Sequence, residues 1–154
     1  MRKGRCANSV FGKRKEDENW PFTTSHKDVP VRIQHRHCST VARSCDTSLA
    51  VARRHLQHAG AVHTGVLTTL ADHTAGAAAQ TLAAEGFFVA TAELKISLLR
   101  TAKGERIVCR GRVVKPGKSV SFVEADICCV AGGEEFLAAR LSATMVFVNV
   151  KNLA

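Results

Sequence analysis

Asp72 is the residue of this sequence best suited to chemistry, because it lies in a segment rich in small apolar side chains. Ala71 and Ala75 lie on the same stretch, and an unpaired carboxylate is costly to bury among such neighbours. Most aspartates inside helices are solvated, but one held on an apolar face is a candidate general base or nucleophile. We therefore take Asp72 as the candidate catalytic carboxylate.

A set of backbone donors precedes Asp72 at the predicted start of the same helix. Thr64 and Gly65 lie there, where N–H groups have no partner within the helix and the helix dipole favours negative charge. Such donors can stabilise an oxygen that becomes negative during a reaction. His63 is either a side chain that contacts a substrate or a structural hydrogen bonder at the helix entry.

Neither the histidines nor the cysteines predict a metal centre or a disulfide framework. His55, His58 and His73 have no cysteine or acid nearby that completes a four-ligand spacing. The six cysteines lack close, regular spacing, which indicates reduced thiols. We expect no metal and no separate cofactor.

The element that carries Asp72 is a predicted helix over residues 66–83, about 27 Å long. Its apolar residues recur at steps of three and four, and Gly86 is a plausible stop after it. A short strand over 48–51 and a loop over 53–62 come before. The many alanines suit a helix that packs closely against a sheet.

Four long strands are predicted after the helix, over residues 88–98, 106–114, 120–130 and 136–148. Turn sequences at 115–118 and 131–134 join the later ones as antiparallel neighbours. This order predicts an α+β protein in which a curved antiparallel sheet wraps one long central helix, the hotdog fold. In the first of these strands, the alternation predicts two sets of residues on opposite faces. The set on the buried face is Phe88, Ala90, Ala92, Leu94, Ile96 and Leu98, and the set on the other face is Thr91, Glu93, Lys95 and Ser97.

Residues 56–65, LQHAGAVHTG, running into Leu70-Ala71-Asp72, resemble the signature of hotdog thioesterases of the phenylacetic-acid-degradation (PaaI) type. In that family a His-Gly-Gly or His-Ala-Gly tripeptide opens the central helix and an acid follows nine positions later, as Asp72 follows His63. The resemblance covers residues 44–148. It continues through residues 98–103, LLRTAK, and 111–118, GRVVKPGK.

The resemblance implies an enzyme that hydrolyses acyl-CoA thioesters to a free acid and CoA. Asp72 would act as general base or nucleophile, and the backbone N–H groups of Thr64 and Gly65 would form the oxyanion hole. Gln57 stands where the family often has asparagine, and its longer amide can still donate to an acyl carbonyl or to water. Thr64 stands where the family has glycine or alanine, which affects the acyl fit. Thr91 matches a position that often carries a hydroxyl to orient water or substrate.

We expect coenzyme A as part of the substrate, and its phosphates need cations near the mouth of the site. Ordinary solvated charge is the alternative interpretation of the basic residues at strand ends and in the turn. The candidate CoA-binding residues are Arg100, Lys103, Arg112, Lys115 and Lys118.

Assembly and two other functions complete the expectations. A sheet wrapped around one helix leaves unpaired edges, which symmetric pairing covers, and the resemblance implies a homodimer or homotetramer.

The alternatives to a thioesterase are a hotdog protein that binds acyl-CoA or acts as a scaffold without turnover, and a hotdog dehydratase. Asp72 favours hydrolysis, since a pure binder has no reason to hold an acid there.

Residues 1–43 form a basic N-terminal extension ahead of a thioesterase domain over residues 44–154. The extension has ten Lys and Arg against four Asp and Glu, within a net charge of +9. It lacks the aromatic interleaving and motifs of nucleic-acid binders, and its composition leads us to expect neither a membrane span nor a secretory signal. We expect a cytoplasmic protein that binds neither nucleic acid nor membrane, with a mitochondrial leader as the alternative. A chain without residues 1–27 should keep the fold, the assembly and the chemistry.

Overall fold

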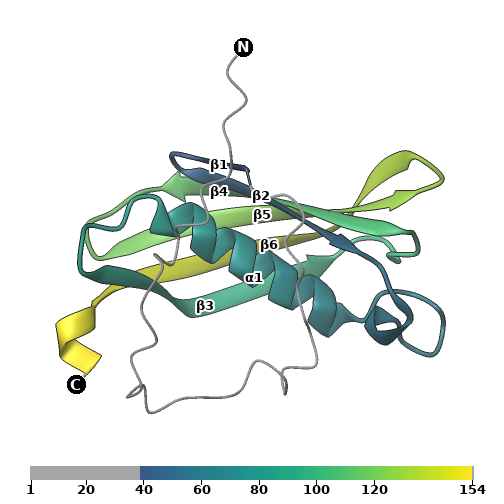
Figure 1. Ribbon diagram of the computed structural model, residues 1–154, viewed down its shortest axis with the longest axis horizontal. Coiled ribbons are helices and arrows are strands. Elements are labelled where there is room, and N and C mark those ends of the chain that lie inside the picture. The colour runs from purple at the N-terminus through teal and green to yellow at the C-terminus, as the bar shows by residue number, and fades with distance from the viewer. Residues whose placement is uncertain (1–38, 154) are drawn as a thin grey trace, which may run out of the picture.

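The computed structural model of the protein describes residues 39–153, which form one antiparallel sheet and one long helix (Figure 1). The sheet has six strands in the order β1-β2-β4-β5-β6-β3, and α1 lies across one of its faces. This architecture confirms the expected α+β hotdog fold. In chain order the elements are β1 (Ser39–Val41), β2 (Ser44–Ala50), the 3₁₀ turn η1 (Arg53–His55), α1 (Thr64–Gln80), β3 (Phe87–Leu98), β4 (Arg106–Lys115), β5 (Val120–Ala131), β6 (Glu134–Asn149) and the 3₁₀ turn η2 (Val150–Leu153).

Helix α1 begins two residues earlier than the sequence predicts and ends three residues earlier. His63 is its N-cap, and the side chain accepts a hydrogen bond from the Gly65 backbone, so the first turn forms ahead of Val66. At the other end the Thr81 hydroxyl donates to the Ala78 carbonyl. Gly86 lies beyond the helix, in the turn before β3, with a φ of +80° that favours glycine.

The helix packs against the sheet at short range, as its alanines predict. Ala71, Ala75, Ala78 and Ala79 are fully buried. Opposite them Gly111 of β4 has no side chain, and a Cβ there would lie 2.9 Å from the carbonyl oxygen of Thr74. The two backbones are therefore close enough that only glycine fits between them.

Strand β3 contains a bulge that corrects the predicted faces. Thr91 pairs with Met145 and Glu93 with Thr144, so Ala92 is an extra residue. Before the bulge Val89 packs against the core, and after it Ile96 does. An odd-numbered and an even-numbered residue thus share one face, because one inserted residue reverses the alternation. The prediction that Phe88 and Ala90 share a face with Leu94, and that Thr91 points away from it, was wrong.

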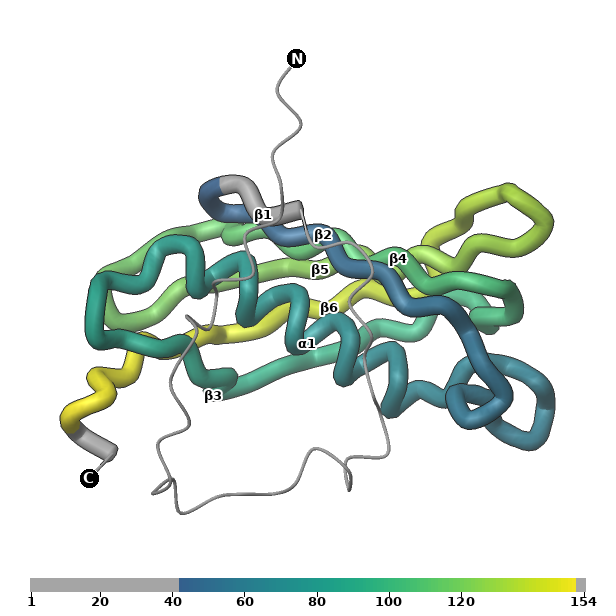
Figure 2. Tube along the Cα trace, viewed as in Figure 1, coloured from purple at the N-terminus to yellow at the C-terminus, as the bar shows by residue number. Residues whose placement is uncertain are grey.

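The connection between β2 and α1 lies at the same end of the molecule as the connection between β3 and β4 (Figure 2). The Val62 N–H donates to the Ala102 carbonyl at 2.8 Å, and Leu56 and Val62 form an isolated bridge. These bonds hold the start of α1 beside the end of β3.

The sheet begins before the predicted domain boundary at residue 44. Strand β1 pairs with β2, with Val41 opposite Ser44. The rest of the N-terminal extension, residues 1–38, lies outside the described residues. None of the helices in the described part of the chain has the length and apolar character needed to cross a membrane.

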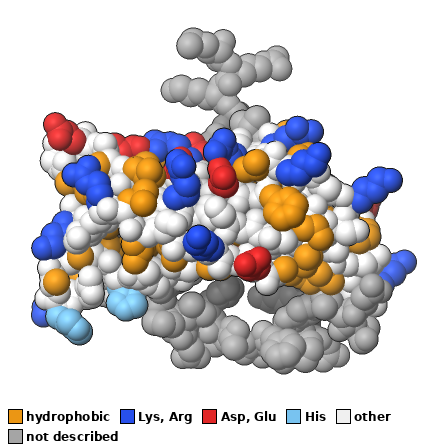
Figure 3. All heavy atoms as spheres, turned by 180° about the vertical axis from the view of Figure 1, so that it is seen from behind, with side chains coloured by type: hydrophobic (Ala, Val, Ile, Leu, Met, Phe, Trp, Pro, Cys, Tyr) orange, Lys and Arg blue, Asp and Glu red, His pale blue; other side chains and the backbone are white. Residues whose placement is uncertain are grey.

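The face of the sheet opposite α1 carries interspersed charges of both signs (Figure 3). Three cross-strand ion pairs lie on the sheet, Arg110 with Glu135, Arg112 with Glu124 and Arg140 with Asp126. Because these side chains are exposed, each pair contributes little to stability, about 1 kcal/mol or less.

Candidate functional site

Asp72 and Thr91 meet across the gap between α1 and β3. The Thr91 hydroxyl donates to Asp72 Oδ1 at 2.7 Å, and the carboxylate is half-buried rather than enclosed. Asp72 Oδ2 has no hydrogen-bond partner among the described residues. One oxygen is thereby held in place by a neutral donor, and the other remains available to a proton or an electrophile.

The bulge in β3 is what brings Thr91 to Asp72. Thr91 is the last residue before the extra Ala92 and pairs with the buried Met145. Its hydroxyl also lies 3.5 Å from the Met145 sulfur. The Thr91 side chain therefore faces the helix, which the alternation of the sequence did not predict, although the resemblance implied a role for this hydroxyl.

Asp72 lies at one end of a hollow of about 210 Å³ between α1 and β3, which we call the Asp72 hollow. Gly76 and Ala77 contribute its small residues, and Val89 and Thr91 its β-branched ones. It is lined by Asp72, His73, Gly76, Ala77, Gln80, Val89 and Thr91.

The start of α1 offers one free backbone donor instead of the two that were expected. The Gly65 N–H donates to His63 Nδ1 at 2.9 Å, so the predicted role of Gly65 in the oxyanion hole is not available in this arrangement. His63 acts as the structural cap, one of the two interpretations of its sequence position. No acceptor occupies the Thr64 N–H among the described residues.

Thr64 and Gln57 line a second hollow of about 270 Å³, the helix-start hollow, together with Leu98, Leu99 and Arg100. The Gln57 backbone is fixed by a bond from its N–H to the Ala61 carbonyl at 2.9 Å, and the side chain is exposed. Asp72 lies eight positions after Thr64 in the helix, about 12 Å along the axis. One chain therefore does not bring the carboxylate and the helix-start donors to one point.

Comparison with known proteins identifies the family of this chain. Residues 59–135 match the family model of the thioesterase superfamily. A thioesterase family protein from Silicibacter pomeroyi is 31% identical over 73% of this chain and 84% of that one, with a TM-score of 0.72. The chain belongs to the thioesterase superfamily. It is accordingly a thioester hydrolase.

Two more distant structures share the fold of this thioesterase. A phenylacetic acid degradation-related protein from Ralstonia eutropha is 23% identical over 71% of this chain and 83% of that one, with a TM-score of 0.63. A Streptococcus mutans protein, solved with acetyl-CoA bound, is 21% identical over 79% and 94%, with a TM-score of 0.66. A search of curated proteins found no match.

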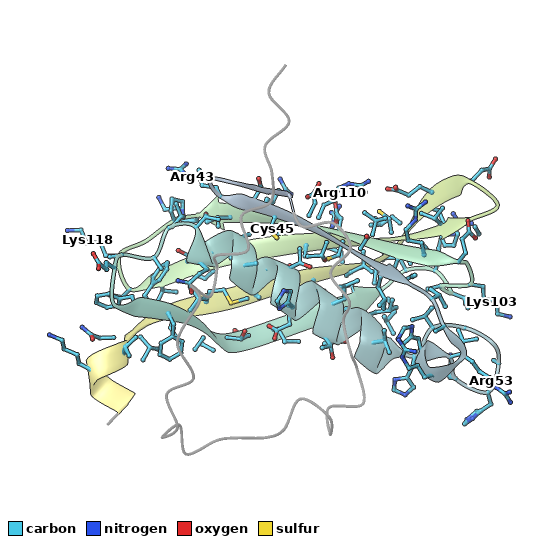
Figure 4. All side chains as sticks on the ribbon, viewed as in Figure 1. Arg43, Cys45, Arg53, Lys103, Arg110 and Lys118 are labelled. Atoms are coloured by element: carbon cyan, nitrogen blue, oxygen red, sulfur yellow. The ribbon has the colours of Figure 1, made fainter. Side chains whose placement is uncertain are left out.

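The five cations predicted for CoA do not form one cluster in the thioesterase. Lys103 and Lys118 lie at opposite ends of the molecule (Figure 4), because successive antiparallel connections alternate between the two ends of a sheet. Lys115 ends β4, just before the turn that carries Lys118. Arg112 lies within β4, where it is paired with Glu124.

Arg100 lies at the end where α1 begins, because it lines the helix-start hollow with Thr64. Lys103 and Arg53 lie at this end as well (Figure 4). The Arg100 guanidinium lies 4.5 Å from the ring centroid of Phe136, a contact that orients the group. Arg53 was not among the cations expected to bind CoA. Its only signal was its position in the loop that leads to the motif.

His55 is a buried residue whose part in the loop was also missed. It is 1% exposed, and its Nδ1 accepts a hydrogen bond from the Ala52 N–H at 3.0 Å. Burial, and secondarily the charge of Arg54, lower the pKa of His55, so the ring is neutral and Nε2 carries the proton. No group of three or more metal-ligating side chains comes together in the described residues.

Proposed function

We propose that this thioesterase hydrolyses acyl-CoA thioesters to a carboxylic acid and CoA, with Asp72 as general base. The observation that carries the proposal is the hydrogen bond from Thr91 to Asp72 Oδ1 at the mouth of a hollow. The superfamily membership supplies the reaction class. The acetyl-CoA bound to the Streptococcus mutans protein supports CoA as the thiol component.

The proposed chemistry uses the two oxygens of Asp72 differently. Oδ1 is held by Thr91, and Oδ2 accepts a proton from a water molecule whose oxygen attacks the thioester carbon. The carbonyl π electrons move onto oxygen and give a tetrahedral oxyanion. When that intermediate collapses, the C–S bond breaks, and the CoA sulfur takes the proton from Asp72.

The oxyanion donor in this proposal comes from a second copy of the chain. The Thr64 N–H of the same chain lies about 12 Å along the helix from Asp72, too far to act on the same carbonyl, and Gln57 lines the helix-start hollow with Thr64. Strand β3 is an edge of the sheet with exposed leucines at 94 and 98, which a second copy would cover. We propose that two copies pair there, so that each Asp72 faces the helix start of its partner.

We assign the CoA phosphates to Arg100 and Lys103, because both lie at the end that holds the helix-start hollow. Arginine binds phosphate through two parallel hydrogen bonds, and lysine adds a compact charge. Replacing either cation by alanine should raise KM for an acyl-CoA while leaving kcat nearly unchanged. The same change at Arg112, which is paired with Glu124, is the control.

The test of the function is release of free thiol from a panel of short, long and aryl acyl-CoA thioesters by the wild-type protein. Turnover of at least one of them is expected, and no release from any would contradict the proposal. Turnover in ¹⁸O-water then separates the mechanisms. A general base leaves Asp72 unlabelled, whereas ¹⁸O incorporated into its carboxylate would make it the nucleophile.

A further inference from the structure

Gly76 is the residue of α1 whose lack of a side chain the fold of the single chain does not explain. A glycine in a helix interior costs about 1 kcal/mol relative to alanine. Gly76 has no positive φ, and a Cβ added to it would meet nothing within 4 Å. Gly111 differs, because a Cβ there would collide with the Thr74 carbonyl. Neither backbone conformation nor packing within the chain therefore requires glycine at 76.

Gly76 lies one helical turn after Asp72, on the same side of α1. Both residues line the Asp72 hollow, and Ala77 is next to them. The floor of the hollow beyond the carboxylate thus consists of Gly76 and Ala77, the two smallest residue types. Any larger residue at 76 would occupy the space directly next to Asp72.

The far end of the hollow is closed by a fixed polar residue whose hydrogen bonds are already made. Gln80 Nε2 donates to the Phe87 carbonyl at 3.2 Å, and Gln80 Oε1 accepts from the Val89 N–H at 2.9 Å. Because both ends of the amide are hydrogen-bonded to the backbone of Phe87 and Val89, the Gln80 side chain is held in place. Its hydrogen-bonding groups are already satisfied, so it does not need a polar group of a ligand. An apolar group could therefore bind over Gly76 without breaking any hydrogen bond of the protein.

We propose that Gly76 determines which acyl groups the enzyme accepts, with the thioester carbon at Asp72 and the acyl chain lying over Gly76 toward Gln80. This inference rests on the proposed acyl-CoA hydrolysis. A cavity of about 150 Å³ holds benzene, and the Asp72 hollow measures about 210 Å³. The acyl group that fits has about six carbon atoms, and a long fatty chain meets Gln80.

The decisive experiment compares the wild type with Gly76→Ala and Gly76→Leu. The measured quantity is the ratio of kcat/KM for hexanoyl-CoA to that for acetyl-CoA, with decanoyl-CoA as the long substrate. Filling a pocket that accepts methylenes changes discrimination by tenfold or more, so the ratio should fall by at least about tenfold in Gly76→Leu. Gly76→Ala should give a smaller fall. The wild type should prefer hexanoyl- over decanoyl-CoA.

Ala84→Leu is the matched control, because Ala84 is exposed and lies outside the Asp72 hollow; its ratio should equal that of the wild type. An unchanged ratio in Gly76→Leu would overturn the inference. The inference would also be overturned if light scattering showed that Gly76→Leu no longer assembles. That result would mean that a second copy of the chain, and not the acyl group, occupies the space over Gly76. If the wild type releases no thiol, the proposed function fails, and the affinities for acetyl- and hexanoyl-CoA by calorimetry still decide whether Gly76 selects the acyl group.

Discussion

At Asp72 the exchange of one oxygen for an NH₂ group should separate chemistry from folding. In Asp72→Asn the amide oxygen can still accept from Thr91, and the side chain is only half-buried, so the fold should persist. The proposed general base is lost, and loss of a general base typically costs about 10²–10⁴ in rate. We expect thiol release to fall by that factor, and likewise in Asp72→Ala, with melting temperatures close to the wild type. Wild-type turnover in either variant would remove Asp72 from the mechanism.

Thr64 allows a backbone donor to be deleted by a side-chain substitution. It is the first residue of α1, a position at which proline is tolerated because the helix does not use that N–H. The preceding His63 has φ −64° and ψ 136°, the extended conformation that a residue before proline adopts. Thr64→Pro should therefore fold, lose the N–H, and lower kcat by about 10²-fold or more.

The control for that variant is Thr64→Ala, which keeps the N–H and removes only the side chain. Its kcat should stay within a few-fold of the wild type, with any change confined to acyl preference. Equal losses in the proline and alanine variants would assign the effect to the threonine side chain and exclude the backbone donor.

At the scale of elements, the sequence predicted the existence and type of every long segment because their periods are unmistakable. The bulge at Ala92 could not be predicted, since Ala90, Ala92 and Leu94 continue a regular alternation and the extra residue is defined only by pairing with β6. The occupied Gly65 N–H was missed for a similar reason. This hydrogen bond depends on the orientation of the His63 ring, which cannot be predicted from the residue types alone.

Strand β4 should make stability fall in alkaline solution. Cys109 is fully buried, and burial raises the pKa of its thiol from 9.0 to about 12, partly offset by a hydrogen bond with Thr74. Below pH 9 both states keep the proton and the contribution is complete. Between pH 9 and about 12 the unfolded chain releases the proton and the folded chain retains it, so stability is lost as pH rises.

The check is the free energy of unfolding in urea at about pH 8 and pH 10, in the wild type and in Cys109→Ala. One titrating group contributes at most ~1.4 kcal/mol per pH unit. The wild type should lose more stability than the variant across this interval. Identical losses would mean that other groups cause the whole pH dependence.

For the whole molecule, mixing two inactive variants tests whether the site is shared. Asp72→Asn and Thr64→Pro each destroy a different half of it. If Asp72 faces the partner's helix start, a mixed pair has one intact site, and random exchange should restore about a quarter of wild-type activity. Light scattering should give a dimer or tetramer mass. No recovery after complete exchange, or a fully active monomer, would place the site within one chain.

The separation of the five predicted cations shows why the site as a whole could not be predicted from spacing. Lys103 and Lys118 are fifteen positions apart in sequence, but one strand runs the length of the molecule between them. Asp72 and Thr91 are nineteen apart and yet in contact. The resemblance implied roles for both Asp72 and Thr91, which lie in contact, whereas the cations were grouped by their nearness in sequence, which a sheet does not preserve.

The bulge in β3 also bears on how far copies of this chain can polymerise. A regular, apolar edge strand can accept neighbours without limit, as in a fibril, whereas an extra residue interrupts the ladder and twists the edge. The opposite edge, β1, has only three residues. If two copies pair through β3 as proposed, the outer edges of the joined sheet are the two β1 strands, whose three described residues offer few backbone groups to a further copy. In the proposed assembly, the inserted residue that turns Thr91 toward Asp72 would also act against open, filament-like pairing.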